Sequence, residues 1–560
     1  MKKLFISIVI VLASLTSCVK LLDKLPLNSY DVTSETAYND AASYLRGLAY
    51  INAYYNFVSI DDPGAADLKF DDAGQSELIR QWICLNELCT DAMDIGWGDS
   101  YIKDLTNHSW TTADNNAIIA VYTRAMKGVT LANEFLLQTT DDKLAARGHQ
   151  SYANEVKRYR AEAKFHRAMF YYILMDLFGN PPFADESNIG GEKLPEQIGR
   201  PALAAWLEGE LKALAADESD LAAKGQVAYP RPNKDAAKAL LARLYLNWEV
   251  YTGEAKWAEA KAIAKEVIDN GYTLHPNYRE LFLQDNGQKC SADEFIFAIE
   301  YDKNVARSWG GTTTLSSGAF NDGMNAFLSG YLNAKLSTDP ESPAAHVSSE
   351  VWNGYHVNPE YVAANFELKD VNFGAMGCTI GYNVATSDKR ALFCNMGKTL
   401  DDKTGEIVSV CEPFAKDKAD TGWKCWKWAW IDSEGLVDPR GDKDVPDWKF
   451  SSADFAIFRL PEMFYIYAEA DARLHGGTTS DATALGYIKQ LRNRAGLTTP
   501  ASMTVADILK DKAAEYFWEG QRRQDEIRLG IFDDDPNRII YPILESDRSA
   551  NPKLNQNDGY

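Results

Sequence analysis

Two separated stretches of the chain repeat one plan, in which an aromatic-rich helix breaks near a glycine and a second helix follows. They span residues 235–271 and 461–496. Each second helix opens with small residues, which let paired helices approach closely: Ala258 and Ala260, and Ala482 and Ala484. Helix pairs with a period of about 34 residues are typical of tetratricopeptide arrays. A single pair cannot bury its apolar face alone, so the pattern predicts helix pairs stacked around a shared core. Helical hairpins without repeat ancestry are the alternative, since the two stretches are not adjacent.

Helical periodicity also covers much of the rest of the chain. In residues 158–178, apolar side chains recur at steps of three and four, which places them on one helical face. The same period predicts helices over residues 116–137, 201–221 and 511–529. The fold class we expect is therefore mainly α, built as a tetratricopeptide-type scaffold of helix pairs.

The character of the sequence changes between Tyr272 and Phe455, where Gly, Asn, Ser, Asp and Pro become frequent and helical periodicity fades. We expect a body over residues 41–560, with its helical scaffold mainly at 41–271 and 456–530. A loop-rich part with a few short strands occupies about 272–455. Long loops carried on a rigid scaffold are where binding residues tend to lie.

The first residues read as a secretory signal. Lys2 and Lys3 precede a short apolar run from Leu4 to Leu15, which is too short to cross a bilayer. The run ends in Leu-Thr-Ser before Cys18, a pattern that looks like a bacterial lipobox. We expect a signal peptide at residues 1–17, acylation of Cys18 and a tether at residues 18–40, because acyl chains hold a protein on a membrane. An ordinary secreted protein with a chance cysteine is the alternative.

Charge and cysteine usage exclude some classes of function. The net charge is −22 and no basic stripe is present, so we expect no nucleic-acid partner. No Cys-x-x-Cys pair occurs, which argues against zinc. Four cysteines (Cys378, Cys394, Cys411 and Cys425) lie close together and could form one or two disulfides or stay as buried thiols. We expect no cofactor. The acidic pairs 61–62, 71–72 and 401–402 leave structural calcium open but unassigned, and DDKTGE is more typical of a hairpin turn.

Motifs of known enzymes are absent from the sequence. It contains no His-Glu-x-x-His, no Gly-x-Ser-x-Gly and no phosphate-binding glycine loop, and only seven histidines. A carboxylate pair distant in the chain could still hydrolyse glycosides, so a lipoprotein glycoside hydrolase stays as an alternative. A helical module that binds only protein is a third reading.

Several short stretches, spread over nearly the whole chain, together resemble one protein family. They are Cys18 followed by LLDKLP, NELCTDAMD (86–94), RYRAEAKFHRAMFYYILMDLFGNPPF (158–183), AAKALLARLYL (236–246), FRLPEMFYIYAEA (458–470), LRNRAGL (491–497), EYFWEGQRRQDEIRLG (515–530) and YPILESDRSANPKLNQNDGY (541–560). In this order they are similar to the SusD/RagB family of outer-membrane lipoproteins of Bacteroidota.

The resemblance implies a SusD-like fold with four tetratricopeptide-like helix pairs and a variable loop-rich part that holds the ligand. It implies a lipid-anchored protein of the outer membrane, facing outward, that is not an enzyme. Its partners would be a glycan oligomer, which it captures, and a SusC-like TonB-dependent transporter, which receives the glycan. Some relatives bind peptide with the same transporter role, so a peptide ligand remains an alternative.

Glycan binding requires exposed aromatic rings, which pack on the C–H faces of sugars, and polar side chains for the hydroxyl groups. The stretch DIGWGDSY offers Trp97 between two glycines, with Asp99 and Tyr101 beside it. We predict these three residues as ligand contacts.

Two further stretches supply ligand-binding candidates. Trp309 stands before two glycines and Asn321 follows in the same Gly/Ser-rich stretch, while Trp352 lies in VWNGYH. In WKCWKWAW the alternating tryptophans would share one face of a strand, which favours packing on the scaffold over binding. Trp110, just before a helix, is likewise expected to pack in the core.

Overall fold

The computed structural model describes residues 37–59, 64–112, 115–187, 194–331, 350–369, 388–397, 400–401, 403–404, 406, 409–434 and 449–560. The predicted signal peptide, Cys18 and most of the tether lie outside these residues. Within the described ranges, no helix combines the length and the apolar character needed to cross a bilayer.

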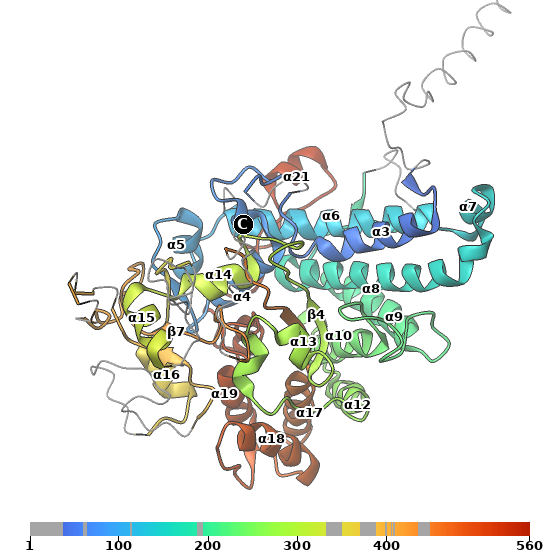
Figure 1. Cartoon of the computed structure of the whole chain (residues 1–560). Coiled ribbons are helices and arrows are strands. Elements are labelled where there is room, and N and C mark those ends of the chain that lie inside the picture. Colours follow the sequence, from blue (N-terminus) through green and yellow to red (C-terminus); the bar gives the residue numbers. More distant parts are fainter. Residues whose placement is uncertain are drawn as a thin grey trace, which may run out of the picture.

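Helices make up about half of the described structure and strands are few and short, so the fold is mainly α, as the sequence predicts (Figure 1). The longest are α6 (Asn116–Gln138) and α8 (Ala153–Phe178), which match the stretches predicted at 116–137 and 158–178. The other scaffold helices are α3 (Ala41–Ala53), α4 (Leu78–Glu87), α7 (Asp141–Ala146), α9 (Arg200–Ala215), α10 (Lys234–Leu246), α11 (Trp248–Thr252), α12 (Trp257–Ile268), α17 (Leu460–Leu474), α18 (Ala482–Arg494), α19 (Val505–Glu515), α20 (Arg522–Leu529) and α21 (Glu545–Ala550).

The scaffold helices pack in series. Contacts run from α6 to α8, then through α9, α10 and α12 to α17, which packs on α18 and α19 (Figure 1). Ala260 on α12 and Ala484 on α18 are fully buried, as expected of small residues between packed helices, whereas Ala258 and Ala482 are exposed and do not serve this role. The two predicted hairpins are confirmed, as α10 to α12 and as α17 with α18.

The loop-rich part carries short strands, as predicted, but also short helices. Five antiparallel pairs of strands occur among the described residues: β1 (Asp94–Ile95) with β5 (Tyr355–His356), β2 (Pro182–Phe183) with β3 (Glu196–Gln197), β4 (Phe295–Ile299) with β8 (Phe455–Arg459), β6 (Phe393–Cys394) with β7 (Lys424–Cys425), and β9 (Thr478–Thr479) with β10 (Met503–Thr504). The short helices of this part are α13 (Asn286–Cys290), α14 (Gly311–Gly318), α15 (Asp322–Tyr331) and α16 (Pro359–Asn365); α5 (Ser100–Thr106) is another short helix, which lies outside it in the sequence.

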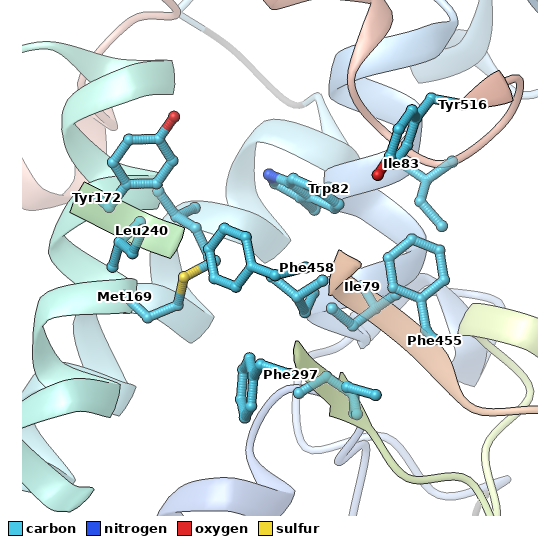
Figure 2. Close-up of a cluster of buried hydrophobic side chains, with 14 of the residues drawn as sticks. Ile79, Trp82, Ile83, Met169, Tyr172, Leu240, Phe297, Phe455, Phe458 and Tyr516 are labelled. Atoms are coloured by element: carbon cyan, nitrogen blue, oxygen red, sulfur yellow. The ribbon is translucent and has the colours of Figure 1, made fainter. Parts of the chain in front are cut away.

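The core joins the scaffold to the loop-rich part. Figure 2 shows side chains of α8 and α10 on one side and those of α4 on the other, with Phe458 of β8 between them. The labelled members are Met169, Tyr172, Leu240, Ile79, Trp82, Ile83, Phe297, Phe455, Phe458 and Tyr516. Burial of these apolar groups fixes the strand pair β4–β8 against the helices.

A buried ionic network holds the same junction. Arg459 at the end of β8 donates to Glu294, to Glu515, the last residue of α19, and to Glu519 in the segment after that helix. Burial by itself raises the pKa of Glu515, but the charges of Arg494 and Arg459 outweigh it and lower that pKa to about 2. Glu515 is therefore ionised and paired in the folded protein.

Two helix predictions need correction. The helix expected over residues 511–529 is broken into α19 and α20, because Trp518 and Gly520 have φ values of 58° and 74°. The Trp518 indole turns inward and donates to the carbonyl of Ala92 at 3.0 Å. The helix expected over 201–221 ends earlier, at Ala215.

The cysteines agree with the disulfide alternative, with a bridge at one of the four predicted positions and free thiols at two others. Cys394 is disulfide-bonded, whereas Cys411 and Cys425 are free. Cys378 lies outside the described residues.

Candidate functional site

Three tryptophans from three separate loops meet at one place. The loop after β1 carries Trp97, and the segment before β5 carries Trp352. Because β1 pairs with β5, with Ile95 opposite Tyr355, these two tryptophans are brought together. The pairing continues into the loop, since the N–H of Gly96 donates to the carbonyl of Gly354 at 3.0 Å. Trp309, before α14, joins them; we call Trp97, Trp309 and Trp352 the tryptophan cluster.

The rings of the cluster form a continuous series. The Trp97 and Trp352 centroids lie 6.3 Å apart with their planes 56° apart, and the Trp352 and Trp309 centroids lie 6.2 Å apart with planes 41° apart. All three side chains are partly exposed. Successive ring faces therefore point in different directions, unlike a flat platform.

Contacts with the residues around β5 fix the position of the Trp97 ring. Its indole lies 5.3 Å from the buried Tyr355 ring, and its Nε1 donates to the Trp352 carbonyl at 3.4 Å, which is a long hydrogen bond. The ring lies against the backbone of Gly354, where a Cβ would overlap it. A glycine at that position is thus required for the indole to sit as it does.

The segment with Trp352 is fixed on α14. The N–H of Trp352 donates to the Ser317 carbonyl at 3.2 Å, and the N–H of Gly354 donates to the Gly318 carbonyl at 2.6 Å. The Trp352 indole donates to Glu350 at 3.3 Å. These bonds hold the ring in place before any ligand arrives.

The Trp309 ring packs on a buried aromatic side chain. Its ring centroid lies 4.6 Å from that of the buried Phe450, and the Arg307 guanidinium lies 5.8 Å from the Phe450 ring. The cluster is therefore backed by packed side chains at Tyr355 and at Phe450.

A polar pair lies beside the cluster. Arg80 on α4 donates to Asp72 at 2.6 Å; the Asp72 side chain is 43% exposed and that of Arg80 only 3%. Gly74 lies against both Arg80 and the Trp309 carbonyl, which places the pair next to Trp309. Sequence reasoning missed this pair, because Asp72 was noted only as half of an acidic doublet and Arg80 was not noted at all.

Asp99 lies at the start of α5 and is partly exposed. Its carboxylate accepts from Gln75 at 3.1 Å, and Gln75 in turn accepts from Asn116 at 2.8 Å. This chain of hydrogen bonds fixes the carboxylate of Asp99, two residues after Trp97, and its partial exposure lets it accept hydrogen bonds from hydroxyl groups.

Tyr101 and Asn321 lie elsewhere than sequence reasoning expected. Tyr101 is 2% exposed, and burial raises its pKa well above the usual value. Asn321 is fully buried and donates to the Met396 carbonyl at 2.8 Å. Both side chains serve the interior of the fold, so the candidate site consists of the tryptophan cluster with Asp72, Arg80 and Asp99.

The tryptophans of WKCWKWAW are buried, as predicted, but only Lys424–Cys425 of that stretch forms a strand. Trp428 stacks on Phe455 of β8 with ring centroids 5.9 Å apart, and Trp430 donates to Ser317 at 3.3 Å. Trp110 is also in the core, as predicted, and donates to Tyr560 at 2.6 Å.

No group of three or more His, Cys, Asp or Glu side chains that could hold a metal ion occurs in the described part of the chain. The Asp401 carboxylate accepts from the backbone of Lys403 and Thr404, which is the turn expected of DDKTGE. Asp61, Asp62 and Asp402 lie outside the described residues.

Comparison with known proteins gives consistent matches. A model of the SusD family matches residues 293–538, and a model described as starch-binding, associating with outer membrane, matches residues 80–246. The chain is 29% identical over 597 aligned residues to the starch-binding protein SusD of Bacteroides thetaiotaomicron, covering 100% of this chain and 99% of that protein.

Solved structures share the fold. Surface glycan-binding protein A from Bacteroides uniformis superposes with a TM-score of 0.64 at 19% identity, covering 92% of this chain and 99% of that one. A laminarin-binding SusD-like protein gives a TM-score of 0.66 at 18% identity, covering 93% and 100%. The mainly α fold, the two family models and the full-length relative agree, and together they identify the chain as similar to the SusD/RagB family.

Proposed function

We propose that this protein binds oligosaccharides at the tryptophan cluster while anchored to the outer membrane, and that it alters no covalent bond in them. One observation carries the proposal: three partly exposed tryptophans from three loops meet beside an exposed carboxylate that is paired with a buried arginine. The similarity to the SusD family and the names of the relatives support it.

The site has the chemistry that sugars require. Each C–H contact with a ring face contributes about 0.5–1 kcal/mol, so three rings together contribute a few kcal/mol. Asp72 and Asp99 accept hydrogen bonds from sugar hydroxyl groups, and Arg80 holds Asp72 in position. Because backbone hydrogen bonds already fix the Trp97 and Trp352 segments, little ordering is left for the ligand to induce.

We propose starch-type fragments as the ligand class. The full-length relative is named as starch-binding. The ring planes of the cluster differ by 56° and 41°, which suits a glycan whose successive sugars turn along the chain. Calorimetric titration with maltoheptaose, with cellohexaose as the flat comparison, tests this. Binding of cellohexaose alone, or of peptide alone on a mixed array, would overturn the choice of ligand.

The same titrated samples test for catalysis. If the protein only captures its ligand, no new reducing ends form during prolonged incubation with maltoheptaose. Release of shorter products, abolished by one carboxylate substitution, would instead identify a glycoside hydrolase.

We further propose that acylated Cys18 anchors the protein to the outer face of the outer membrane, and that a SusC-like TonB-dependent transporter receives the glycan. The lipobox-like sequence and the family support this arrangement. Mass spectrometry of the mature N-terminus would detect the acyl chains, and Cys18→Ala would release the protein from membranes. Copurification of a transporter with the tagged full-length protein tests the partner.

A further inference from the structure

A buried glutamate lies directly beneath the loop that carries Trp309. Glu77, at the start of α4, is fully buried. Its carboxyl group lies against Gly310, at a point where a Cβ on that residue would collide with it. The residue after Trp309 must therefore be glycine for the loop to rest on Glu77.

Two more glycines, Gly311 and Gly74, allow the protein to pack closely around the loop that carries Trp309. A Cβ on Gly311 would overlap the Tyr301 hydroxyl, and a Cβ on Gly74 would collide with the Trp309 carbonyl. Gly311 also has a φ of 41°, in the left-handed region that glycine adopts without strain. The Trp309 backbone is thus enclosed between Gly74 on one side and Glu77 on the other.

The carboxyl group is itself held in place. The Tyr301 hydroxyl donates to Glu77, and Tyr301 is buried just after β4. The hydroxyl of Ser308, the residue before Trp309, accepts from the Gly310 N–H at 2.9 Å and so fixes the turn of the loop over the carboxyl group. Glu77 therefore connects β4, α4 and the loop of Trp309 through one side chain.

We infer that Glu77 is a positioning residue for the glycan site, and that the proton on its carboxyl group keeps Trp309 in the binding arrangement. This inference rests on the proposed function only for its effect on affinity. The hold on Trp309 is a property of the unliganded protein and can be measured without a glycan.

The electrostatics give the direction of the effect. Burial raises the pKa of Glu77 to about 8, against the opposing effects of the Tyr301 and Ser308 hydroxyls and the charges of Arg80 and Arg124. The carboxyl group is thus neutral at pH 6.5 and ionises as the pH rises through about 8. An ionised carboxylate in this buried position is costly in free energy. We therefore expect the loop that carries Trp309 to shift when Glu77 ionises.

A second buried carboxyl lies close by and must be distinguished. Asp454 accepts from the Tyr301 N–H at 2.9 Å, and burial raises its pKa to about 7. The midpoint of a pH titration alone therefore does not distinguish Glu77 from Asp454. The variant Glu77→Gln does, because it keeps the shape of the side chain and removes its charge.

The direct test is ¹⁹F NMR of the protein labelled with 5-fluorotryptophan, with the Trp309 resonance assigned by Trp309→Phe. We expect this resonance to titrate with a midpoint near pH 8 in the native protein and to stay constant from pH 6.5 to 9.5 in Glu77→Gln. The matched control is Glu87→Gln. Glu87 is also on α4 and its pKa is also raised by burial to about 8, but it bonds the backbone of Gly520 and Gln521. That variant should titrate like the native protein.

A second variant, Tyr301→Phe, tests the same inference if Glu77→Gln does not fold. Since the Tyr301 hydroxyl lowers the pKa of Glu77, Tyr301→Phe should move the Trp309 titration to higher pH. A Trp309 resonance that does not move with pH in the native protein, or that still titrates in Glu77→Gln, overturns the inference.

The functional readout is the affinity for maltoheptaose, a neutral ligand with no titration of its own in this range. We expect the affinity to fall about three- to tenfold from pH 6.5 to 9.5, as for partial loss of one aromatic contact, and to be constant in Glu77→Gln. Affinity that is equally constant in the native protein contradicts the inference. Absence of glycan binding at every pH overturns the proposed function instead, and the ¹⁹F titration then decides on Glu77 independently.

Discussion

Replacement of Trp97 by alanine tests the role of the tryptophan cluster most cleanly. A sugar that covers about 40–60 Å² of the exposed indole contributes about 1–1.5 kcal/mol by apolar burial. The C–H contacts to the ring face add about 0.5–1 kcal/mol. We therefore expect Trp97→Ala to lose about 1.5–2.5 kcal/mol of binding free energy, which is an increase in Kd of about 10- to 70-fold.

The stability cost of this substitution should be small. Trp97 is only partly buried, and its single hydrogen bond, to Trp352, is long at 3.4 Å. A fully buried tryptophan costs about 3–5 kcal/mol when replaced by alanine, so we expect about 1–2 kcal/mol here. In a chain of this size that lowers Tm by at most about 4 °C.

A matched control separates lost contact from lost stability. Trp206 on α9 is also partly buried and also packs on two rings, Tyr171 at 5.3 Å and Phe183 at 5.2 Å. Trp206→Ala should lower Tm by a similar amount and leave the Kd for maltoheptaose unchanged in calorimetry. The reasoning is refuted if Trp97→Ala binds as well as the native protein, or if both variants lose affinity in parallel.

Three further predictions follow from particular contacts. Gly354→Ala should weaken glycan binding severalfold in calorimetry although no ring is removed, because its Cβ displaces the Trp97 indole; unchanged affinity would contradict that packing. Arg459→Met should destabilise the protein by about 3–5 kcal/mol in urea unfolding, since three buried carboxylates each lose one of their cationic partners and the buried network is left with excess negative charge; a neutral effect would show that the remaining cations suffice. Acid should destabilise the fold: arginine partners hold the pKa of Glu469 and Glu515 at about 2 against the ordinary 4.5, so this stability is present above pH 4.5 and is lost as the pH falls through 2. Urea midpoints that stay constant from pH 5 to 2 would refute it.

The helices could be predicted from the sequence because their signal is local. Apolar residues at helical spacing mark α6 and α8, and glycines mark the ends of the hairpins. The break between α19 and α20 could not be predicted, because it depends on the Trp518 indole finding a distant carbonyl at Ala92.

The candidate site was accessible to sequence reasoning only in part. Glycine neighbours marked Trp97 and Trp309 as loop tryptophans, and the structure places both in the cluster. No sequence pattern predicts that these tryptophans come together, because their proximity depends on the pairing of two-residue strands that lie far apart in the chain. Tyr101 was misjudged because its position next to a loop says nothing about which way the side chain of α5 points.

The central claim is that the tryptophan cluster is the glycan-binding site. The most direct measurement is calorimetric titration of maltoheptaose into the mature protein and into a variant with Trp97, Trp309 and Trp352 all replaced by alanine, with folding of the variant checked by circular dichroism. We expect saturable binding to the native protein and none to the folded variant. Equal binding by both proteins would contradict the account.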